Sequence, residues 1–217
     1  MYMGVTVSGY SSAFFIPTIL TGFHYSPSQS QLHTIPVYVV CTGVTLISAW
    51  ASDRLRHRYS FIMGGIILAT IGYIILLAQG PVEGPGALPY SVRYMAVFFV
   101  VSGIYITQPI SIVWLTNNMG GHYKRAFGTA TQIGIGNVGG IIGSNIYLTK
   151  QAPRFWTGYG TALAMLWFCA LMSTILYFGM IAENKKRDRG ERDDRLSLPK
   201  AQLENLGDAH PEFRFSG

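Results

Sequence analysis

The chain has 217 residues, of which 49% are hydrophobic and 12% are charged, and its formal net charge is +6. Soluble proteins carry about 25% charged residues, so this composition argues against an ordinary soluble domain. The positive charge comes from residues 1–182, where eight Lys and Arg and only two acids lie in short segments between apolar runs. Basic residues scattered in this way do not form the single patch that nucleic-acid binding needs, so no nucleic-acid partner is expected.

Six apolar runs follow one another along the chain, and each is close to the roughly 20 residues that a membrane-spanning helix needs. They cover about 5–22, 35–51, 61–79, 94–115, 126–148 and 159–182, and none has a charged residue or histidine in its interior. The run 61–79 also lacks the polar stripe of a helix in a soluble protein. The sequence therefore predicts an all-α integral membrane bundle of six transmembrane helices over residues 1–182, surrounded by a lipid bilayer.

The basic residues outside the runs predict the orientation of this bundle. The second connection, the fourth connection and the start of the tail hold Arg54, Arg56, Arg58, Lys124, Arg125, Lys185, Lys186, Arg187 and Arg189. The opposite side holds only Arg93, Lys150 and Arg154. Because cytoplasmic loops of membrane proteins are enriched in Lys and Arg, both termini are predicted to be cytoplasmic. Residues 183–217, with eight basic and eight acidic side chains, are predicted to form a disordered cytoplasmic tail.

Polar residues and interior prolines concentrate in the first and fourth runs. They are Tyr10, Ser11, Ser12 and Pro17, then Tyr105, Thr107, Gln108 and Pro109. Their positions favour a 3+3 inverted repeat, in which broken helices meet at a binding site near the midplane. Hydrogen bonding across a packed bundle is the alternative, and it stays open for the serines and threonines. The larger amides Gln108 and Asn137 favour a cavity.

The fifth run contains the sequence GIGNVG at 134–139, which matches the dinucleotide-binding fingerprint formally. That fingerprint works only between a strand and a helix, so the match inside an apolar run is accidental. Gly136 with Gly140, and Gly139 with Gly143, have the spacing of small residues at a close helix–helix contact. We expect these glycines to pack against a neighbouring helix.

The second connection begins with an acid, Asp53, followed by Arg54, Arg56 and Arg58. Negative charge is unfavourable at a helix carboxyl terminus, so Asp53 should have a fixed cationic partner or the amino terminus of another helix beside it. Simple pairing with neighbouring arginines at the lipid headgroups is the alternative. Trp50, Trp114 and Trp156 lie near the expected interfaces, where tryptophans anchor membrane helices.

The sequence does not indicate an enzyme. No nucleophile–base pair, carboxylate dyad or cluster with metal-ligand spacing is present, so neither a metal nor another cofactor is expected. Cys41 and Cys169 lie deep in apolar runs and are expected to behave as small hydrophobic residues.

Several of these stretches resemble a known family. The Asp-Arg-x-Arg connection at 53–56 is similar to the cytoplasmic signature of the major facilitator superfamily. Residues 9–20, 117–147, 183–189 and 206–215 resemble the carboxyl-terminal half of fungal anion:cation symporters, the allantoate and nicotinate permease group. The resemblance covers essentially the whole chain and implies one half of a twelve-helix transporter fold, its seventh to twelfth spans.

The resemblance implies a proton-coupled carrier of small organic anions, such as nicotinate or allantoate, that works by alternating access in the plasma membrane. The missing amino-terminal half would supply the other wall of the cavity, together with the buried cation and titratable group. The six-span chain is then expected to be inactive alone, whether it is a fragment, a truncated product or one chain of a split transporter.

Within such a half, neutral hydrogen-bonding and aromatic side chains are the candidates for the substrate cavity. They are Tyr10, Phe14, Tyr105, Gln108, Gln132 and Asn137. Asp53, Arg54, Arg56 and Arg58 would belong to the gating surface. A membrane subunit that regulates a full-length transporter is an alternative, and a homodimeric six-span carrier or channel is a third. The substrate, the coupling ion and the oligomeric state do not follow from the sequence.

Overall fold

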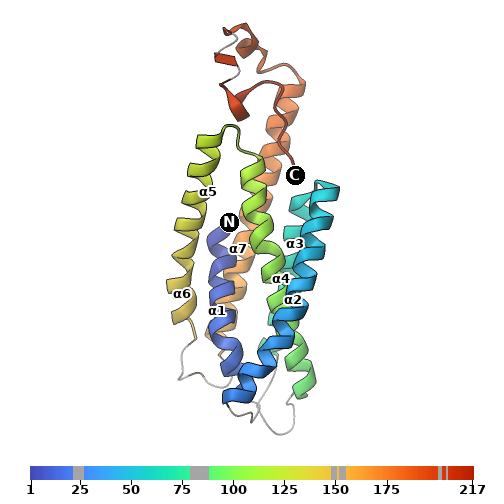
Figure 1. Cartoon of the computed structure of the whole chain (residues 1–217), viewed down its shortest axis with the longest axis vertical. Coiled ribbons are helices and arrows are strands. Elements are labelled where there is room, and N and C mark those ends of the chain that lie inside the picture. The colour runs from blue at the N-terminus through green and yellow to red at the C-terminus, as the bar shows by residue number, and fades with distance from the viewer. Residues whose placement is uncertain (22–26, 79–87, 148–150, 152–154, 200–201, 204) are drawn as a thin grey trace.

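The computed structural model describes residues 1–21, 27–78, 88–147, 151, 155–199, 202–203 and 205–217 (Figure 1). Seven α-helices lie in these ranges: α1 (Tyr2–Thr21), α2 (Pro27–Leu55), α3 (Arg58–Leu77), α4 (Tyr90–Asn117), α5 (His122–Asn137), α6 (Gly139–Asn145) and α7 (Trp156–Asp188). Two short 3₁₀ turns follow, η2 (Asp193–Ser197) and η3 (Gly207–Ala209). The described part contains no strand, which confirms the predicted all-helical class.

The helices run up and down along the long axis of the molecule (Figure 1). One end of the bundle contains the end of α2, the start of α3, the end of α4, the start of α5 and the end of α7. We call this the basic end, because the connections that hold Arg54–Arg58 and Lys124–Arg125 meet there with the tail.

Four of the helices, α2, α3, α4 and α7, are long and apolar enough to cross a membrane. More than half of the side-chain surface of Leu32, Val39, Leu46, Ile47 and Trp50 on α2 is exposed. An apolar surface of this extent is typical of contact with lipid or with another protein rather than with water. The chain is an integral membrane protein.

The fifth apolar run differs from the single helix expected over 126–148, because Val138 divides it into α5 and α6. The Val138 amide donates to Ile135 O at 3.2 Å and the Ile141 amide donates to Val138 O at 3.0 Å, so the helix tightens locally to a 3₁₀ turn. Glycine is a poor helix former, and four glycines lie at positions 134, 136, 139 and 140. In α4, by contrast, the helix continues through Pro109, although interior prolines were expected to break the first and fourth helices.

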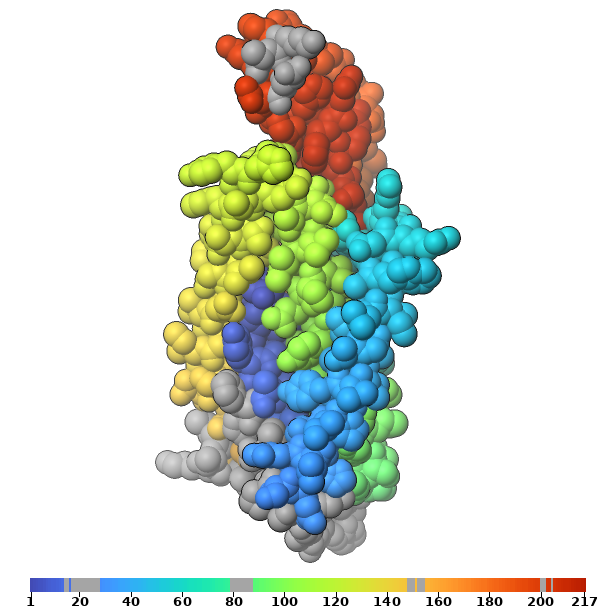
Figure 2. Space-filling view, viewed as in Figure 1, coloured from blue at the N-terminus to red at the C-terminus, as the bar shows by residue number. Residues whose placement is uncertain are grey.

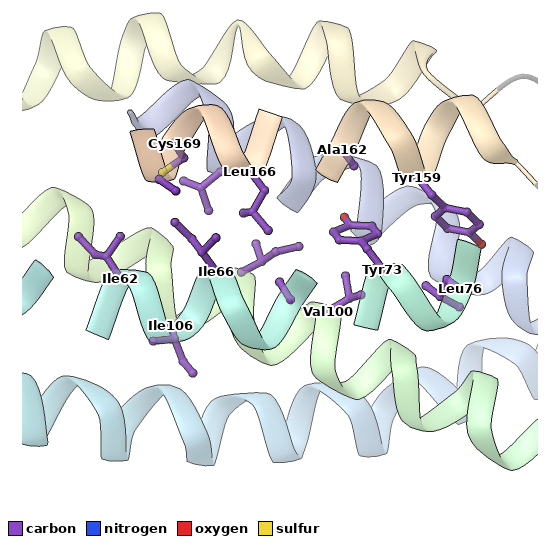
Figure 3. Close-up of a cluster of buried hydrophobic side chains, with 14 of the residues drawn as sticks. Ile62, Ile66, Tyr73, Leu76, Val100, Ile106, Tyr159, Ala162, Leu166 and Cys169 are labelled. Atoms are coloured by element: carbon purple, nitrogen blue, oxygen red, sulfur yellow. The ribbon is translucent and has the colours of Figure 1, made fainter. Parts of the chain in front are cut away.

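The core lies where α3 packs between α4 and α7 (Figure 3). Ile62 and Ile66 of α3 face Leu166 and Cys169 of α7, and Tyr73 approaches Tyr159 with a ring-centroid distance of 6.4 Å. Glycines allow α3 and α4 to approach closely: a Cβ atom added to Gly72 would lie 2.6 Å from Ala96 O.

The carboxyl-terminal region differs from the disordered tail expected over 183–217. Helix α7 continues to Asp188, and residues 205–217 return to the basic end and pack there (Figure 1). The cause is local pairing: Glu183 accepts hydrogen bonds from the Arg192 guanidinium at 2.9 and 3.0 Å, and Arg187 is only 7% exposed. A mixed-charge sequence can thus fold on itself where its charges find fixed partners.

Candidate functional site

A groove with a volume of about 550 Å³ opens between the amino terminus of α1, the end of α4, and α5 and α7. In the space-filling view, the first residues of α1 lie at its floor between α4 and α5 (Figure 2). Its lining is mostly apolar, with polar groups from Tyr2, Lys124, Thr131 and Gln132. An apolar groove with a few polar groups has the general character of a small-molecule site.

Gln132 is the residue among the six cavity candidates that lines this groove. Its Nε2 donates to Ser111 O of α4 at 3.3 Å. Its Oε1 is buried and has no hydrogen-bond partner among the described residues. A carboxamide oxygen can accept two hydrogen bonds, so this groove-lining side chain has an unused, buried acceptor.

Gln108 lies beside the groove and connects α4 to α1. Its Nε2 donates to the Tyr2 hydroxyl at 3.3 Å. The Tyr2 ring in turn covers Gly136 of α5, where an added Cβ atom would collide with the ring. Gln108 therefore fixes the side chain that forms one wall of the groove.

The remaining candidates lie away from this groove. The Tyr10 hydroxyl donates to Asn137 Oδ1 at 3.4 Å on the exposed surface between α1 and α5. Tyr105 packs edge-to-face against Tyr38 of α2, with a centroid distance of 6.1 Å. The side chain of Phe14 is outside the described part of the structure. Of the predicted cavity residues, Gln132 thus lines the groove and Gln108 lies beside it, whereas the Tyr10–Asn137 and Tyr105–Tyr38 contacts lie elsewhere in the bundle.

Hydroxyl groups on α1 connect neighbouring helices through hydrogen bonds. Thr6 Oγ1 donates to Gly136 O at 2.6 Å, and Ser8 Oγ donates to Ala162 O of α7 at 2.9 Å. Ser12 shares a 3.3 Å hydrogen bond with the Tyr73 hydroxyl. For these three residues, the geometry agrees with the bundle-packing alternative.

Gly136 of α5 and the three glycines of α6, Gly139, Gly140 and Gly143, lie against α1. A Cβ atom on Gly139 would be 2.7 Å from Thr6 Oγ1, and one on Gly143 would be 2.7 Å from Val7 O. At Gly140 the nearest atoms belong to the Tyr10 ring, at 3.1 Å. Their contact with α1 holds the interrupted α5–α6 segment close to the floor of the groove.

The Asp53 connection joins three helix ends. Arg58 Nη2 donates to Asp53 Oδ1 at 2.7 Å. When the Asn117 amide is oriented with its oxygen toward the guanidinium, that oxygen accepts from Arg58 at 2.8 and 2.5 Å. Arg54 lies over the Trp50 ring, 5.8 Å from its centroid, and Arg56 is exposed with a left-handed φ of 55°. The partner of Asp53 is therefore a neighbouring arginine that is fixed by a third helix.

Sequence reasoning missed two features of this molecule. Arg93 was assigned to an outer loop, but α4 begins at Tyr90, directly after Pro89, so that Arg93 is in the first turn and is only 4% exposed. Proline before a helix was the signal that could have moved this boundary. Trp114 is not an interfacial anchor, since it is completely buried and its Nε1 donates to Ser216 O at 2.8 Å.

Known proteins similar to this chain are fungal transporters. The chain is 30% identical over 213 residues to the high-affinity nicotinic acid transporter of Saccharomyces cerevisiae, and the alignment covers 98% of the chain. It is 33% identical over 217 residues to the MFS-type transporter cnsO of Penicillium expansum, again over 98% of the chain. Over nearly its whole length, the chain is thus similar to transporters of the major facilitator type.

The chain spans about two-fifths of the length of these relatives, namely 38% and 41%. A third relative, an uncharacterized transporter of Schizosaccharomyces pombe, is 33% identical over 95% of the chain and is covered to 39%. No family model matches the chain, and no solved structure does. All three of these relatives are named as transporters.

Proposed function

We propose that the chain is the carboxyl-terminal half of a proton-coupled transporter for small organic anions, and that it works together with a second six-helix half. In this proposal α1 and the interrupted α5–α6 segment also cross the membrane, which gives six spans arranged as a 3+3 repeat. The supporting observation is that nearly the whole chain aligns with two-fifths of several transporters, one of which is named a nicotinic acid transporter.

The groove and its flanks would form this half's wall of the substrate path. Gln132 has an amide oxygen without a partner, while Gln108, Tyr10 and Asn137 add neutral hydrogen-bonding groups on α4, α1 and α5, the helices that border the groove. Lys124 is the charged residue of the groove lining, and it is already paired with Asp208 at 2.6 Å. An organic anion would therefore need a further cation from the second half.

A chimera tests the transport proposal. The segment of the nicotinic acid transporter that aligns with this chain is replaced by residues 1–217, and uptake is measured in cells that lack nicotinate uptake. We expect uptake driven by an inward proton gradient from the chimera, and none from the chain alone. Uptake by the purified chain alone in liposomes, or a well-folded chimera at the membrane that transports no carboxylate, would refute the proposal.

The basic end is proposed to face the cytoplasm, together with both termini. The native Cys41 and Cys169 are buried, so the background of thiol labelling is low. A cysteine in place of the exposed Arg56 should resist a membrane-impermeant maleimide in intact cells and react after permeabilisation. Equal labelling of intact and permeabilised cells would reverse the orientation.

A further inference from the structure

The last residues of the chain, 206–217, lie across the basic end and form what we call the carboxyl-terminal strap. Two asparagines hold its main chain in paired hydrogen bonds. Asn184 of α7 donates to Phe215 O at 2.9 Å and accepts from the Phe215 amide at 3.0 Å. Asn118, at the end of α4, donates to Ser216 O at 3.1 Å and accepts from the Ser216 amide at 2.8 Å.

One nearly buried cation organises the rest of the strap. Arg187 of α7 donates to the main-chain oxygens of Asp208, His210 and Phe213 at 3.0, 3.3 and 2.7 Å. Its guanidinium also lies over the Phe215 ring, 4.7 Å from the centroid. A planar guanidinium with five donors can hold a folded main chain in this way, whereas a lysine cannot. The strap is thus anchored firmly to α7.

The strap reaches α5 by a different and weaker contact. Lys124 Nζ, in the first turn of α5, lies 2.6 and 2.7 Å from the two Asp208 carboxylate oxygens, and the lysine side chain is 57% exposed. Nearby, the main chain of Gly207 packs against that of Gly120. The Asp208 side chain is only 18% exposed, but the exposed ammonium group of Lys124 lets salt screen the pair.

The first half of α5 has little packing of its own. Residues 121–127 are all exposed, and Gly136 is the only fully buried residue that α5 contributes within the described part of the chain. This half of α5 nevertheless forms a wall of the groove, through Lys124, Phe127 and Gly128. This first half is therefore held mainly by the strap, whereas the second half of α5 is held by the Gln132–Ser111 and Thr6–Gly136 hydrogen bonds and ends at the 3₁₀ turn at Val138.

We propose that the strap is a two-part latch in which Arg187 anchors residues 206–217 permanently to α7, while Asp208 holds the first turn of α5 reversibly. Breaking the Lys124–Asp208 pair would let α5 tilt at Val138, which would also release the Gln132–Ser111 hydrogen bond and widen the groove. The link between this tilt and substrate passage rests on the proposed transport function, but the latch itself does not.

Distances between spin labels test the latch without any transport measurement. Nitroxides are attached to cysteines that replace Tyr123, at the exposed start of α5, and Lys186, on the exposed face of α7, in the full chain in lipid nanodiscs. We expect one narrow distance in this parent. Asp208→Asn should broaden it and lengthen it by about 5 Å or more, since a tilt of roughly 15° moves the end of a helix of about 24 Å by that much.

Three comparisons make this result specific. Glu191→Gln removes another exposed tail pair, with Arg189, and should leave the distance unchanged. The double exchange Lys124→Asp with Asp208→Lys should restore the narrow distance, and about 1 M salt should act like Asp208→Asn because it screens exposed charges. If Asp208→Asn leaves the distance narrow and unshifted, and the chain still melts cooperatively, then the proposed reversible contact is wrong.

The permanent anchor has its own readout. Arg187→Gln should free the strap and speed tryptic cleavage after Arg214 about tenfold or more, because cleavage follows the population of the open segment. Asp208→Asn should leave Arg214 protected. Protection of Arg214 in Arg187→Gln, or its loss in Asp208→Asn, would show that the two contacts are not divided in this way. Loss of nicotinate uptake in the chimera would leave these results untouched, so the two proposals fail separately.

Discussion

Arg58 and Asp53 form a 2.7 Å ion pair in which the arginine side chain is 10% exposed and the aspartate side chain is 68% exposed. The pair spans the turn between α2 and α3, which reverses at Arg56. Since the Asn117 amide faces the same guanidinium, Arg58 also connects this turn to the end of α4. The arginine is therefore the structural centre of the connection, and the aspartate is one of its partners.

This asymmetry predicts unequal effects of removing the two partners. Asp53→Asn should lower stability by about 1 kcal/mol or less, because the carboxylate is largely in water. Arg58→Gln should cost about 1–3 kcal/mol, because it removes a nearly buried guanidinium that joins Asp53 at the end of α2 to Asn117 at the end of α4. Thermal unfolding of the detergent-solubilised chain measures both. Equal losses would mean that the pair, and not the arginine, carries the stability.

Two adjacent glycines of α3 give a matched test of its contact with α4. A Cβ atom on Gly65 would lie 2.7 Å from Gly103 O and would also meet Thr107, whereas one on Gly64 would meet nothing within 4 Å. We expect Gly65→Ala to destabilise the chain by about 1–3 kcal/mol through overpacking. Gly64→Ala should be neutral or stabilise by up to about 1 kcal/mol, since alanine favours the helix. Melting curves in one detergent compare them, and a harmless Gly65→Ala would contradict this close approach.

The contact between α6 and α1 can be tested in the same manner. Gly143→Ala brings a Cβ atom to 2.7 Å from Val7 O, while Gly134→Ala enters open space. The first change should lower the melting temperature and the second should not, because only the first forces α6 away from α1. If Gly134→Ala proved the more damaging, flexibility near Val138 rather than packing would be the role of these glycines.

Replacing either of the two glutamines of the site should reduce transport, but the loss of stability should be larger for Gln108 than for Gln132. Gln132→Leu should change stability by less than about 1 kcal/mol, because it removes a buried oxygen that has no partner as well as one hydrogen bond. Gln108→Leu should cost about 1 kcal/mol, because the Tyr2 hydroxyl loses its donor. In the transporter chimera, both changes should reduce nicotinate uptake. Normal uptake with Gln132→Leu would remove this residue from the substrate path.

The sequence by itself determined that this protein lies in a lipid bilayer and not in water. Long runs without charge can be stable as helices only in hydrocarbon or in a large apolar core, and lipid requires every main-chain group to be bonded within its own helix. The helical class, the membrane location and the end of the bundle at which Arg54, Arg58 and Lys124 gather follow from these local properties. The resemblance to fungal transporters was also carried by contiguous stretches, and this is why it could be seen without the fold.

Tertiary structure decided which polar groups meet. Gln108 and Tyr2 are 106 positions apart, and Lys124 and Asp208 are 84 apart, so no spacing rule could pair them. The tail was expected to be disordered because its composition is charged. In the structure, Arg187 donates hydrogen bonds to three carbonyl oxygens of the same tail, and these bonds order it. Composition determines whether a segment prefers water or an apolar environment on average. A buried cation, however, is stable only where the folded chain brings hydrogen-bond acceptors within reach of it.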